Sequence, residues 1–288
     1  MTHMKSPCNI CIEEECKGAH NCHCETCELR MKCPKHLHAT IRITNKCTQK
    51  CSHCCFNSSP ESNIMMTVEM AQDIAKFVRN NNVEYLNLMG GEFFCNPDWY
   101  KILSILIDST TFARIVSNGD WANSNVVKTQ LLKLKDEFGN KFKISISKDR
   151  WHTNENVEKA EEFLKEKNFL YNIAKESETT DESIVPIGRS MFSFSMFSMF
   201  QCYCHEPDKK YGFLIDEDGD IFKCEFGNFA YANIHEYIDG GFDARFKEYN
   251  KKFYEIFIPS CKTCANYCEF LPKDKREAYG RKITVNRD

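Results

Sequence analysis

Four cysteines lie within nine positions in the segment 45-NKCTQKCSHCCFN-57. Cys47, Cys51 and Cys54 have the spacing C-x3-C-x2-C, and Cys55 is an additional neighbour. Iron–sulfur clusters and structural zinc ions usually take four protein ligands, so three thiols on one loop leave one iron open to a substrate or cofactor. The spacing therefore predicts a cluster with a ligand position, and we expect Cys55 to pack rather than to bind.

The remaining cysteines fall into two further groups. The chain has 18 cysteines, of which seven precede residue 34, six follow residue 201 and Cys95 stands apart. The N-terminus lacks the basic and then apolar pattern of a secretory signal, which predicts a cytoplasmic protein in a reducing compartment. Closely spaced cysteines in such a compartment are typical of metal or cluster ligands rather than of disulfides.

Composition limits the class of protein. The 288 residues are 42% hydrophobic, which is enough for a substantial buried core. The formal net charge is -3, and no apolar run reaches the roughly 20 residues needed to span a bilayer. Neither nucleic acid nor a membrane is therefore expected as a partner.

The cysteines are expected between a strand and a helix. Residues 39–44 alternate between apolar and polar, and residues 67–80 have helical spacing behind a Thr67 cap with Glu69 in the first turn. The loop would therefore follow the carboxyl end of a strand, where α/β barrels carry their chemistry.

Further strands and helices alternate along the chain, which predicts an α/β fold with a parallel sheet and crossover helices. One apolar strand ends in Gly90, Gly91 and Glu92, and the glycines would let the backbone approach a ligand closely. The expected helices are 98–109, 124–139 and 155–167, and the expected strands are 83–92, 112–119, 142–147 and 169–174.

The cysteine spacing and the Gly-Gly-Glu segment together resemble the radical S-adenosylmethionine (radical SAM) superfamily, whose motif is C-x3-C-x-aromatic-C. His53 occupies the aromatic position. The resemblance implies a partial (β/α)6 TIM-type barrel over residues 39–200, a [4Fe–4S] cluster on the three cysteines, and S-adenosylmethionine bound through its amino group by the Gly-Gly-Glu segment.

Other polar positions at strand ends would contact the same cofactor by resemblance, although ordinary turn residues could explain each of them. Trp151 and His152 either face the substrate or pack on the rim of the barrel. Arg189, in a Pro-x-Gly-Arg segment, would pair with the cofactor carboxylate. The remaining cofactor-binding candidates are Ser117, Asn118, Ser145, Ser147 and Lys148.

Residues 201–288 form a small cysteine-rich region with a predicted hairpin at 211–224. Its cysteine spacing resembles the auxiliary-cluster extension called SPASM or, in its shorter form, twitch. The resemblance implies a second [4Fe–4S] cluster, and a zinc-binding hairpin is the alternative. The expected ligands are Cys204, Cys224, Cys261 and Cys264.

Residues 1–38 are too rich in cysteine to build an apolar core, so we expect a metal to organise them. Either zinc or a third iron–sulfur cluster would suit their C-x2-C pairs. The candidate ligands, of which a subset would bind, are Cys8, Cys11, Cys16, Cys22, Cys24, Cys27 and Cys33.

The resemblance implies reductive cleavage of S-adenosylmethionine to a 5′-deoxyadenosyl radical, with electrons from a partner such as flavodoxin or ferredoxin. Enzymes with auxiliary clusters often modify ribosomally made peptides by epimerisation, thioether formation or carbon–carbon crosslinking. An epimerase would need a thiol as hydrogen donor, for which Cys202, Cys268 and Cys95 are candidates, although an inert buried cysteine is the commoner explanation for any single one of them.

Two alternatives stay open. Residues 1–38 are too short and too cysteine-rich for the winged-helix segment that recognises leader peptides in many such enzymes, which keeps a small-molecule metabolite as an alternative substrate. A non-catalytic scaffold that binds several zinc ions is a remote third reading, against which the Gly-Gly-Glu segment argues.

Overall fold

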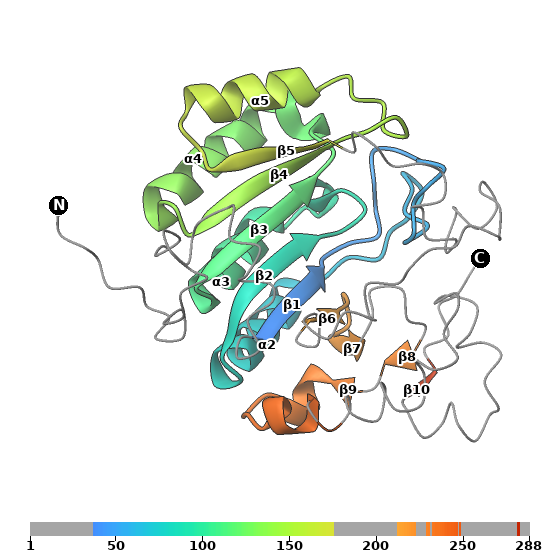
Figure 1. The fold of residues 1–288 in the computed structure, drawn as a ribbon, viewed down its shortest axis with the longest axis vertical. Helices are drawn as coiled ribbons and strands as arrows, with labels where there is room; N and C mark the ends of the chain where they lie inside the picture. The colour runs from blue at the N-terminus through green and yellow to red at the C-terminus, as the bar shows by residue number, and fades with distance from the viewer. Residues whose placement is uncertain are drawn as a thin grey trace, which may run out of the picture.

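The computed structural model describes residues 37–175, 212–222, 229–230, 232–246, 248 and 281–282. These residues form an α/β fold built on an eight-stranded sheet in the order β5-β4-β3-β2-β1-β6-β7-β9, with a separate two-stranded sheet of β8 and β10 (Figure 1). The predicted α/β class with a parallel sheet is confirmed, and the sheet is open, as a partial barrel requires.

The first five strands are parallel and adjacent in chain order. Right-handed crossovers between neighbours taken in order place every connecting helix on the same side of the sheet. The strands are β1 (Leu37–Arg42), β2 (Val83–Met89), β3 (Phe112–Ser117), β4 (Phe142–Lys148) and β5 (Tyr171–Lys175).

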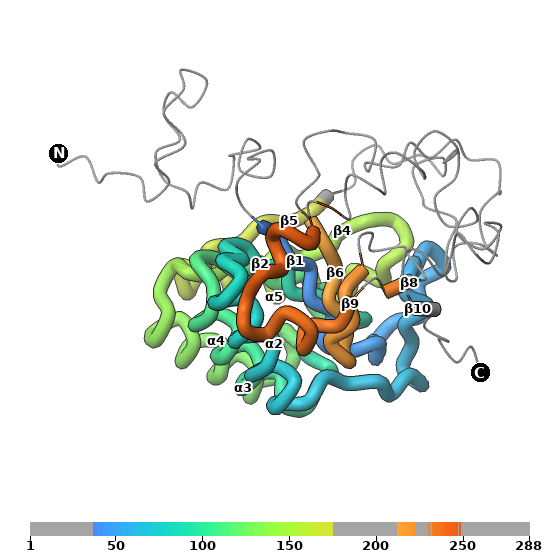
Figure 2. Tube along the Cα trace, turned by 90° about the horizontal axis from the view of Figure 1, so that it is seen from below, coloured from blue at the N-terminus to red at the C-terminus, as the bar shows by residue number. Residues whose placement is uncertain are grey.

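The connecting helices accordingly cover one face of this sheet, as both views of the fold show (Figures 1 and 2). They are α2 (Val68–Asn80), α3 (Trp99–Ser109), α4 (Asn125–Phe138) and α5 (Val157–Glu166). The short helical turns η2 (Phe93–Cys95) and η3 (Asp120–Asn123) follow β2 and β3 directly. We call the opposite side of β1 to β5 the helix-free face, a term that refers to the described residues.

Two helices begin where the sequence predicts. Thr67 caps α2, because its side chain accepts a hydrogen bond from the Met70 amide, and Glu69 lies in the first turn. Ser124 caps α4 in the same way through the Val127 amide. β1 ends two residues earlier than predicted, because Thr44 and Lys46 pair with Met65 and Ser59 through isolated bridges instead of continuing the ladder.

The core lies between the sheet and the helices. Alternate residues of β1 (Leu37, Ala39 and Ile41) are buried against the helices, and β2, β3 and β4 bury apolar residues in the same core. The intervening residues point to the helix-free face and are mostly polar and partly buried. This alternation separates an apolar core from a polar surface on the two sides of one sheet.

A hairpin extends the sheet beyond β1. β6 (Gly212–Ile215) pairs parallel with β1 and antiparallel with β7 (Asp220–Phe222), which in turn pairs with β9 (Ala232–Asn233). The predicted hairpin is therefore confirmed, and β6 belongs to the same sheet as the predicted barrel. The turn η7 (Ile234–Tyr237) follows β9, and β8 (Phe229–Ala230) pairs with β10 (Arg281–Lys282).

Candidate active site

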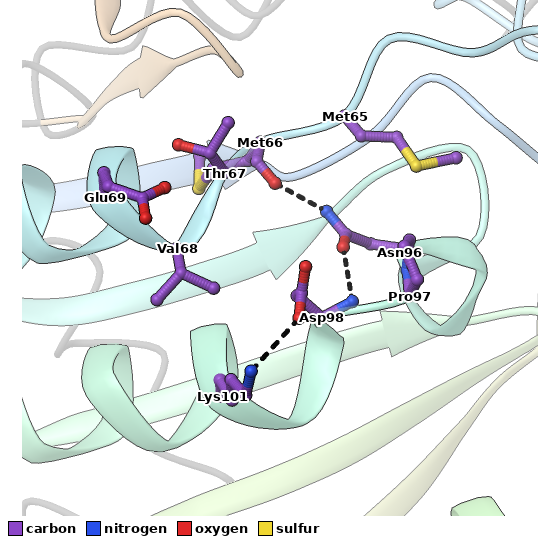
Figure 3. A pocket seen from close by; sticks show the side chains of 9 residues that line it. All are labelled: Met65, Met66, Thr67, Val68, Glu69, Asn96, Pro97, Asp98 and Lys101. Atoms are coloured by element: carbon purple, nitrogen blue, oxygen red, sulfur yellow. Dashed lines mark hydrogen bonds and ion pairs between the residues drawn. The ribbon is translucent and has the colours of Figure 1, made fainter.

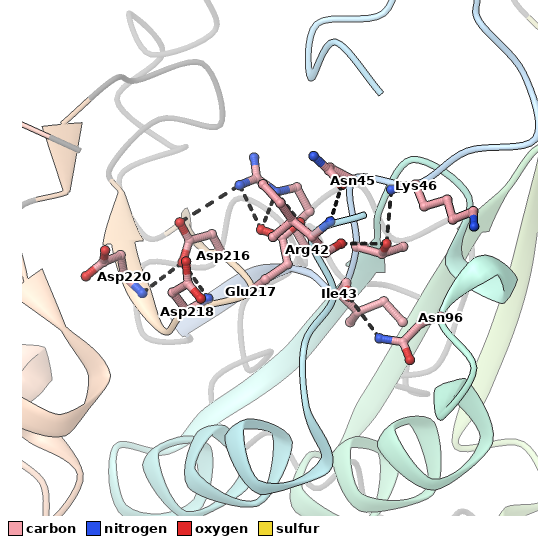
Figure 4. Close-up of polar contacts among 11 residues, drawn as sticks. Arg42, Ile43, Asn45, Lys46, Asn96, Asp216, Glu217, Asp218 and Asp220 are labelled. Carbon is pink, nitrogen blue, oxygen red and sulfur yellow. Dashed lines mark hydrogen bonds and ion pairs between the residues drawn. The ribbon is translucent and has the colours of Figure 1, made fainter. Parts of the chain in front are cut away.

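The segment from residue 43 to residue 66 leaves the end of β1, carries the cysteines and returns to α2; we call it the cysteine loop. Ile43 accepts a backbone hydrogen bond from Met66 at 2.9 Å, which closes the loop at its base. The side-chain amide of Asn96 donates to the carbonyl oxygens of both Ile43 (3.1 Å) and Met66 (3.0 Å) (Figures 3 and 4). One buried asparagine thus joins the two ends of the loop.

The three predicted ligands lie on this loop as thiols; Cys47 is buried, and Cys51 and Cys54 are half-buried. Backbone amides donate to two of the sulfurs, from Gln49 to Cys47 (3.4 Å) and from Ser58 to Cys54 (3.3 Å). Burial, together with the charges of Glu92, Cys51 and Cys54, raises the pKa of Cys47 to about 12, although the hydrogen bond from the Gln49 amide opposes this shift. The cationic iron–sulfide core of a cluster would stabilise the thiolates and so offset the cost of ionising these crowded cysteines.

Gly90 and Gly91 are required by close packing against the cysteine loop. A Cβ on Gly91 would lie 2.4 Å from the Lys46 carbonyl oxygen and 2.8 Å from Ser58 Cβ. A Cβ on Gly90 would lie 2.8 Å from the Thr44 carbonyl oxygen. The amides of Gly91 and Glu92 donate to the carbonyls of Thr44 and Lys46, both at 2.8 Å. The end of β2 therefore packs directly against the cysteine loop and supports it.

Glu92 is fully buried and ties β2 to β3. Its carboxylate accepts hydrogen bonds from the Ser117 hydroxyl (2.9 Å), the Asn118 amide (2.8 Å) and the Phe94 amide (3.5 Å). Burial raises the pKa of Glu92 to about 7, while these donors favour the charged form. Glu92, Ser117 and Asn118 were each predicted to contact the cofactor, and the structure brings the three together through hydrogen bonds. We call these three residues the Glu92 unit.

Asn118 continues the network to the cysteine loop. Its side-chain amide donates to Thr48 Oγ1 at 2.9 Å and lies 3.9 Å from Cys47 Sγ. Asp120, in η3, accepts from the Thr48 hydroxyl and from Gln49 Nε2. The first half of the cysteine loop is thereby held against the end of β3, and sequence reasoning identified neither Thr48, Gln49 nor Asp120.

His53, at the aromatic position of the motif, packs against the loop that follows β4. Its ring stacks on Trp151 (5.1 Å between centroids) and meets His152 edge-on (5.0 Å). Asp149 accepts a hydrogen bond from the ring of His152 at 2.7 Å. Burial opposes ionisation of Asp149, but this hydrogen bond and the charge of His152 lower the pKa of Asp149. Ring nitrogens of His53 and His152 and a carboxylate oxygen of Asp149 lie within 4.8 Å of one another, so these residues connect the cysteine loop to the loop that follows β4.

The remaining predicted cofactor contacts that the structure describes are spread along β4. Ser145 is fully buried and accepts a hydrogen bond from Arg114 Nη2 at 3.0 Å. Ser147 is half-buried, and Lys148 lies 3.6 Å from Glu158. Cys95, in η2, is half-buried, and burial raises its pKa to about 11, so it is a protonated thiol at neutral pH.

Other predicted site residues lie outside the described residues. They comprise the N-terminal cysteines, the expected auxiliary-cluster ligands, Arg189 and two hydrogen-donor candidates. In order, they are Cys8, Cys11, Cys16, Cys22, Cys24, Cys27, Cys33, Arg189, Cys202, Cys204, Cys224, Cys261, Cys264 and Cys268.

An ion pair that sequence reasoning missed joins β1 to the hairpin. Arg42, at the end of β1, contacts Glu217 (2.8 Å) and Asp216 (3.9 Å) of the turn between β6 and β7 (Figure 4). Its guanidinium also lies over the ring of Phe56 in the cysteine loop, 5.4 Å from the centroid. Burial raises the pKa of Asp216 to about 7, although Arg42 opposes this shift.

A cavity of about 480 Å³ opens between the first turns of α2 and α3, bounded by residues 65–69, 96–98 and Lys101 (Figure 3). The Asn96 side chain accepts from the Asp98 amide there, and Asp98 pairs with Lys101 at 3.6 Å. The cysteines and the Glu92 unit are not among its lining residues. The cavity therefore lies outside the candidate active site.

Comparison with known families shows what this arrangement resembles. Residues 41–173 match the profile of the Radical SAM superfamily, and this range contains the cysteine loop, the Glu92 unit and the first five strands. The matched residues, which make up less than half of the chain, resemble a radical SAM domain. The superfamily implies S-adenosylmethionine and a [4Fe–4S] cluster, for which the thiols of Cys47, Cys51 and Cys54 are the fitting donor set.

Two curated proteins of Bacillus subtilis (strain 168) resemble the chain. One is the antilisterial bacteriocin subtilosin biosynthesis protein AlbA, 28% identical over 116 residues, which are 40% of this chain and 25% of AlbA. The other is YydG, named for peptide biosynthesis, 27% identical over 115 residues, which are 39% of this chain and 36% of YydG. The similarity thus spans a quarter to about a third of these relatives.

Among solved structures, BtrN in complex with AdoMet and 2-DOIA aligns with a TM-score of 0.54 and 14% identity, over 80% of this chain and 92% of BtrN. This likeness shows that the chain shares its fold with BtrN. Within the described part of the chain, no helix has the length and apolar character needed to cross a membrane.

Proposed function

We propose that this chain is a radical SAM enzyme that modifies a ribosomally made peptide by epimerisation, thioether formation or carbon–carbon crosslinking. The observation that carries the proposal is the cysteine loop, which presents three thiols and packs on the Gly-Gly-Glu segment with its buried Glu92. The bound cluster and S-adenosylmethionine would supply a 5′-deoxyadenosyl radical that abstracts a hydrogen atom from the substrate.

The protein's own residues would position the reactants. Glu92 would hold the ends of β2 and β3 together, so that Gly91 supports the cysteine loop and Asn118 faces Cys47. His53 would place an aromatic surface over the ligand position, supported by Trp151. Such fixed geometry keeps a reactive species near its target and away from water.

Peptide substrates are favoured because AlbA and YydG are both named for bacteriocin or peptide biosynthesis. A second cluster on the C-terminal cysteines would suit a peptide-modifying enzyme of the SPASM or twitch kind. Flavodoxin or ferredoxin is proposed as the electron donor.

The first test is anaerobic reconstitution with iron and sulfide, followed by S-adenosylmethionine and dithionite. Wild type should form 5′-deoxyadenosine, and Cys51→Ala should not. Cys55→Ala is the matched control, because Cys55 is a half-buried cysteine of the same loop outside the three-thiol spacing. Equal cleavage by wild type and Cys51→Ala would refute the proposal.

Iron counting tests the second cluster. Two [4Fe–4S] clusters give about eight irons per chain, and Cys224→Ser or Cys261→Ser should lower the count by about four. Unchanged iron in both variants would exclude an auxiliary cluster on these residues. A variant starting at residue 37 should lose further iron or zinc if the N-terminal cysteines bind metal.

The hydrogen-donor candidates can be separated in deuterated water. If the enzyme is an epimerase, the donor thiol delivers solvent deuterium to the product Cα. Variants Cys95→Ala, Cys202→Ala and Cys268→Ala should include one that consumes S-adenosylmethionine without forming the deuterated product. Deuterated product from all three would rule out every candidate.

A further inference from the structure

Buried polar atoms without partners gather on the helix-free face. Among the described residues, Arg114 Nε, Asn87 Oδ1 and Asn172 Oδ1 are buried and lack a hydrogen-bond partner. Buried polar groups in folded proteins are nearly always paired, so three orphans on one surface call for an explanation. An apolar core would not place them there.

Strand register shows that these atoms belong to one continuous patch. Asn87 of β2 lies beside Arg114 of β3, and Ser145 of β4 lies beside Asn172 of β5. Arg114 links the two pairs, because its Nη2 donates to Ser145 Oγ at 3.0 Å. We call Asn87, Arg114, Ser145 and Asn172 the inner polar patch; it crosses four neighbouring strands.

The patch is electrostatically unbalanced. The described residues give Arg114 a hydrogen bond to a neutral hydroxyl, and none of the ion pairs in that part of the chain involves it. By contrast, Arg42 on the same face is paired with Glu217. Arg114 therefore has a charged N–H group that an anionic partner could accept from.

The side chains of the inner polar patch favour one kind of ligand. A guanidinium with an available N–H suits a carboxylate, which can accept two parallel hydrogen bonds. A side-chain amide can donate and accept at once, whichever way it is turned, and so pairs well with a peptide bond. The patch combines one such cation with two amides, which matches an acidic residue within a peptide.

The position of the patch suits a substrate. Arg114 lies three residues before Ser117 on β3, which corresponds to about 10 Å along a strand, so the patch lies deeper in the sheet than the Glu92 unit. We propose that the inner polar patch binds a carboxylate of the substrate, such as an acidic side chain near the modified residue. This inference rests on the proposed function, because it assumes that the substrate enters the helix-free face.

The test uses the reconstituted full chain with S-adenosylmethionine and three capped eight-residue peptides that differ only in a central Glu, Gln or Lys. We expect the Glu peptide to bind about tenfold more tightly than the Gln peptide. Arg114→Gln should abolish this preference, and Arg114→Lys should restore part of it, since a point charge lacks the planar fork. Arg79→Gln is the matched control, because Arg79 is an exposed arginine of α2.

Thermal unfolding shows whether Arg114→Gln is folded. A second variant tests the inference without removing Arg114. Asn87→Asp places a negative charge beside Arg114 and should reverse the preference in favour of the Lys peptide. Preference for Glu that survives both variants would overturn the inference. Weaker binding of S-adenosylmethionine by Arg114→Gln, with the Glu preference intact, would also overturn it and assign Arg114 to the cofactor carboxylate.

Glutarate separates the two sources of a substrate carboxylate. Binding of glutarate that depends on Arg114, without binding of the Glu peptide, would support the carboxylate site and assign it to a small molecule. Wild type that forms 5′-deoxyadenosine but does not distinguish Glu from Gln would refute the inference and leave the proposed function standing. Wild type that forms none would instead count against the proposed function.

Discussion

Ser117 donates a hydrogen bond to Glu92 Oε1 at 2.9 Å, which joins the ends of β3 and β2 in a fully buried contact. A neutral Gln at residue 92 would turn its NH2 group toward a backbone amide donor, either that of Phe94 or that of Asn118. Such a buried mismatch costs about 1–3 kcal/mol. We expect Glu92→Gln to unfold at lower temperature and to form less 5′-deoxyadenosine.

Ser117→Ala separates the hydrogen bond from the charge. This variant removes one donor to Glu92 and one acceptor for the Gly119 amide, but the Asn118 amide still binds the carboxylate. Each lost hydrogen bond costs about 0.5–1.5 kcal/mol, so we expect Ser117→Ala to unfold at a lower temperature than wild type although Glu92 keeps its carboxylate. Equal unfolding temperatures for both variants and wild type would disprove this account of Glu92.

Gly91→Ala should disrupt the cysteine loop. The new Cβ would lie 2.4 Å from the Lys46 carbonyl oxygen, so the backbone on both sides must move. We expect loss of most of the iron at the three-cysteine site, measured by iron content and by the absorbance of the reconstituted cluster. Gly212→Ala is the control, because its Cβ would meet no atom within 4 Å. Normal iron in Gly91→Ala would contradict the packing argument.

Asn96→Ala should loosen the base of the cysteine loop. The variant loses two side-chain donors to the carbonyls of Ile43 and Met66 and leaves both oxygens buried without that partner. A destabilisation of about 2–4 kcal/mol is expected from two such losses. Thermal unfolding measures it, with Asn123→Ala as the control for an exposed asparagine. A loss no larger than that of the control would mean that Asn96 does not hold the loop.

Asp216→Asn should change how stability depends on pH. Because the pKa of Asp216 in the folded protein is raised from 3.8 to about 7, its contribution to stability is full below pH 3.8 and is lost as the pH rises through about 7. Asparagine does not ionise, and its Oδ1 can still accept from the amides of Asp218 and Asp220. The variant should therefore lose less stability than wild type between pH 5 and pH 8.

The expected difference for Asp216→Asn is on the order of 2 kcal/mol, since Arg42 offsets part of the burial cost. Unfolding by denaturant at several pH values would measure it. Asp218→Asn, an exposed residue of the same turn, should run parallel to wild type. If Asp216→Asn also ran parallel to wild type, burial would not control the titration of Asp216.

Local patterns predicted the elements of the domain well, because apolar periodicity and capping residues act within a few positions. Thr67 and Ser124 start their helices as expected, and the cysteine loop lies between β1 and α2. The ends of elements were less accurate. Isolated bridges at Thr44 and Lys46 ended β1 early, and a pattern of apolar residues does not report such pairings.

Polar contacts between residues far apart in the chain could not be predicted from the sequence. Asn96 bonds Ile43 across 53 positions, and Arg42 bonds Glu217 across 175 positions. No spacing rule connects residues so far apart. Glu92 was correctly selected by its Gly-Gly-Glu context, but its hydrogen bonds to Ser117 and Asn118 became visible only when β2 and β3 were placed side by side.

The pairing of β6 with β1 has a consequence for the order in which the protein can assemble on the ribosome. Strands β1 to β5 pair with neighbours that follow closely in the chain, so they can associate while synthesis continues. The other edge of β1 must wait for residues 212–215. During that interval the strand that leads into the cysteine loop exposes unpaired backbone groups, a hazard for association with other chains.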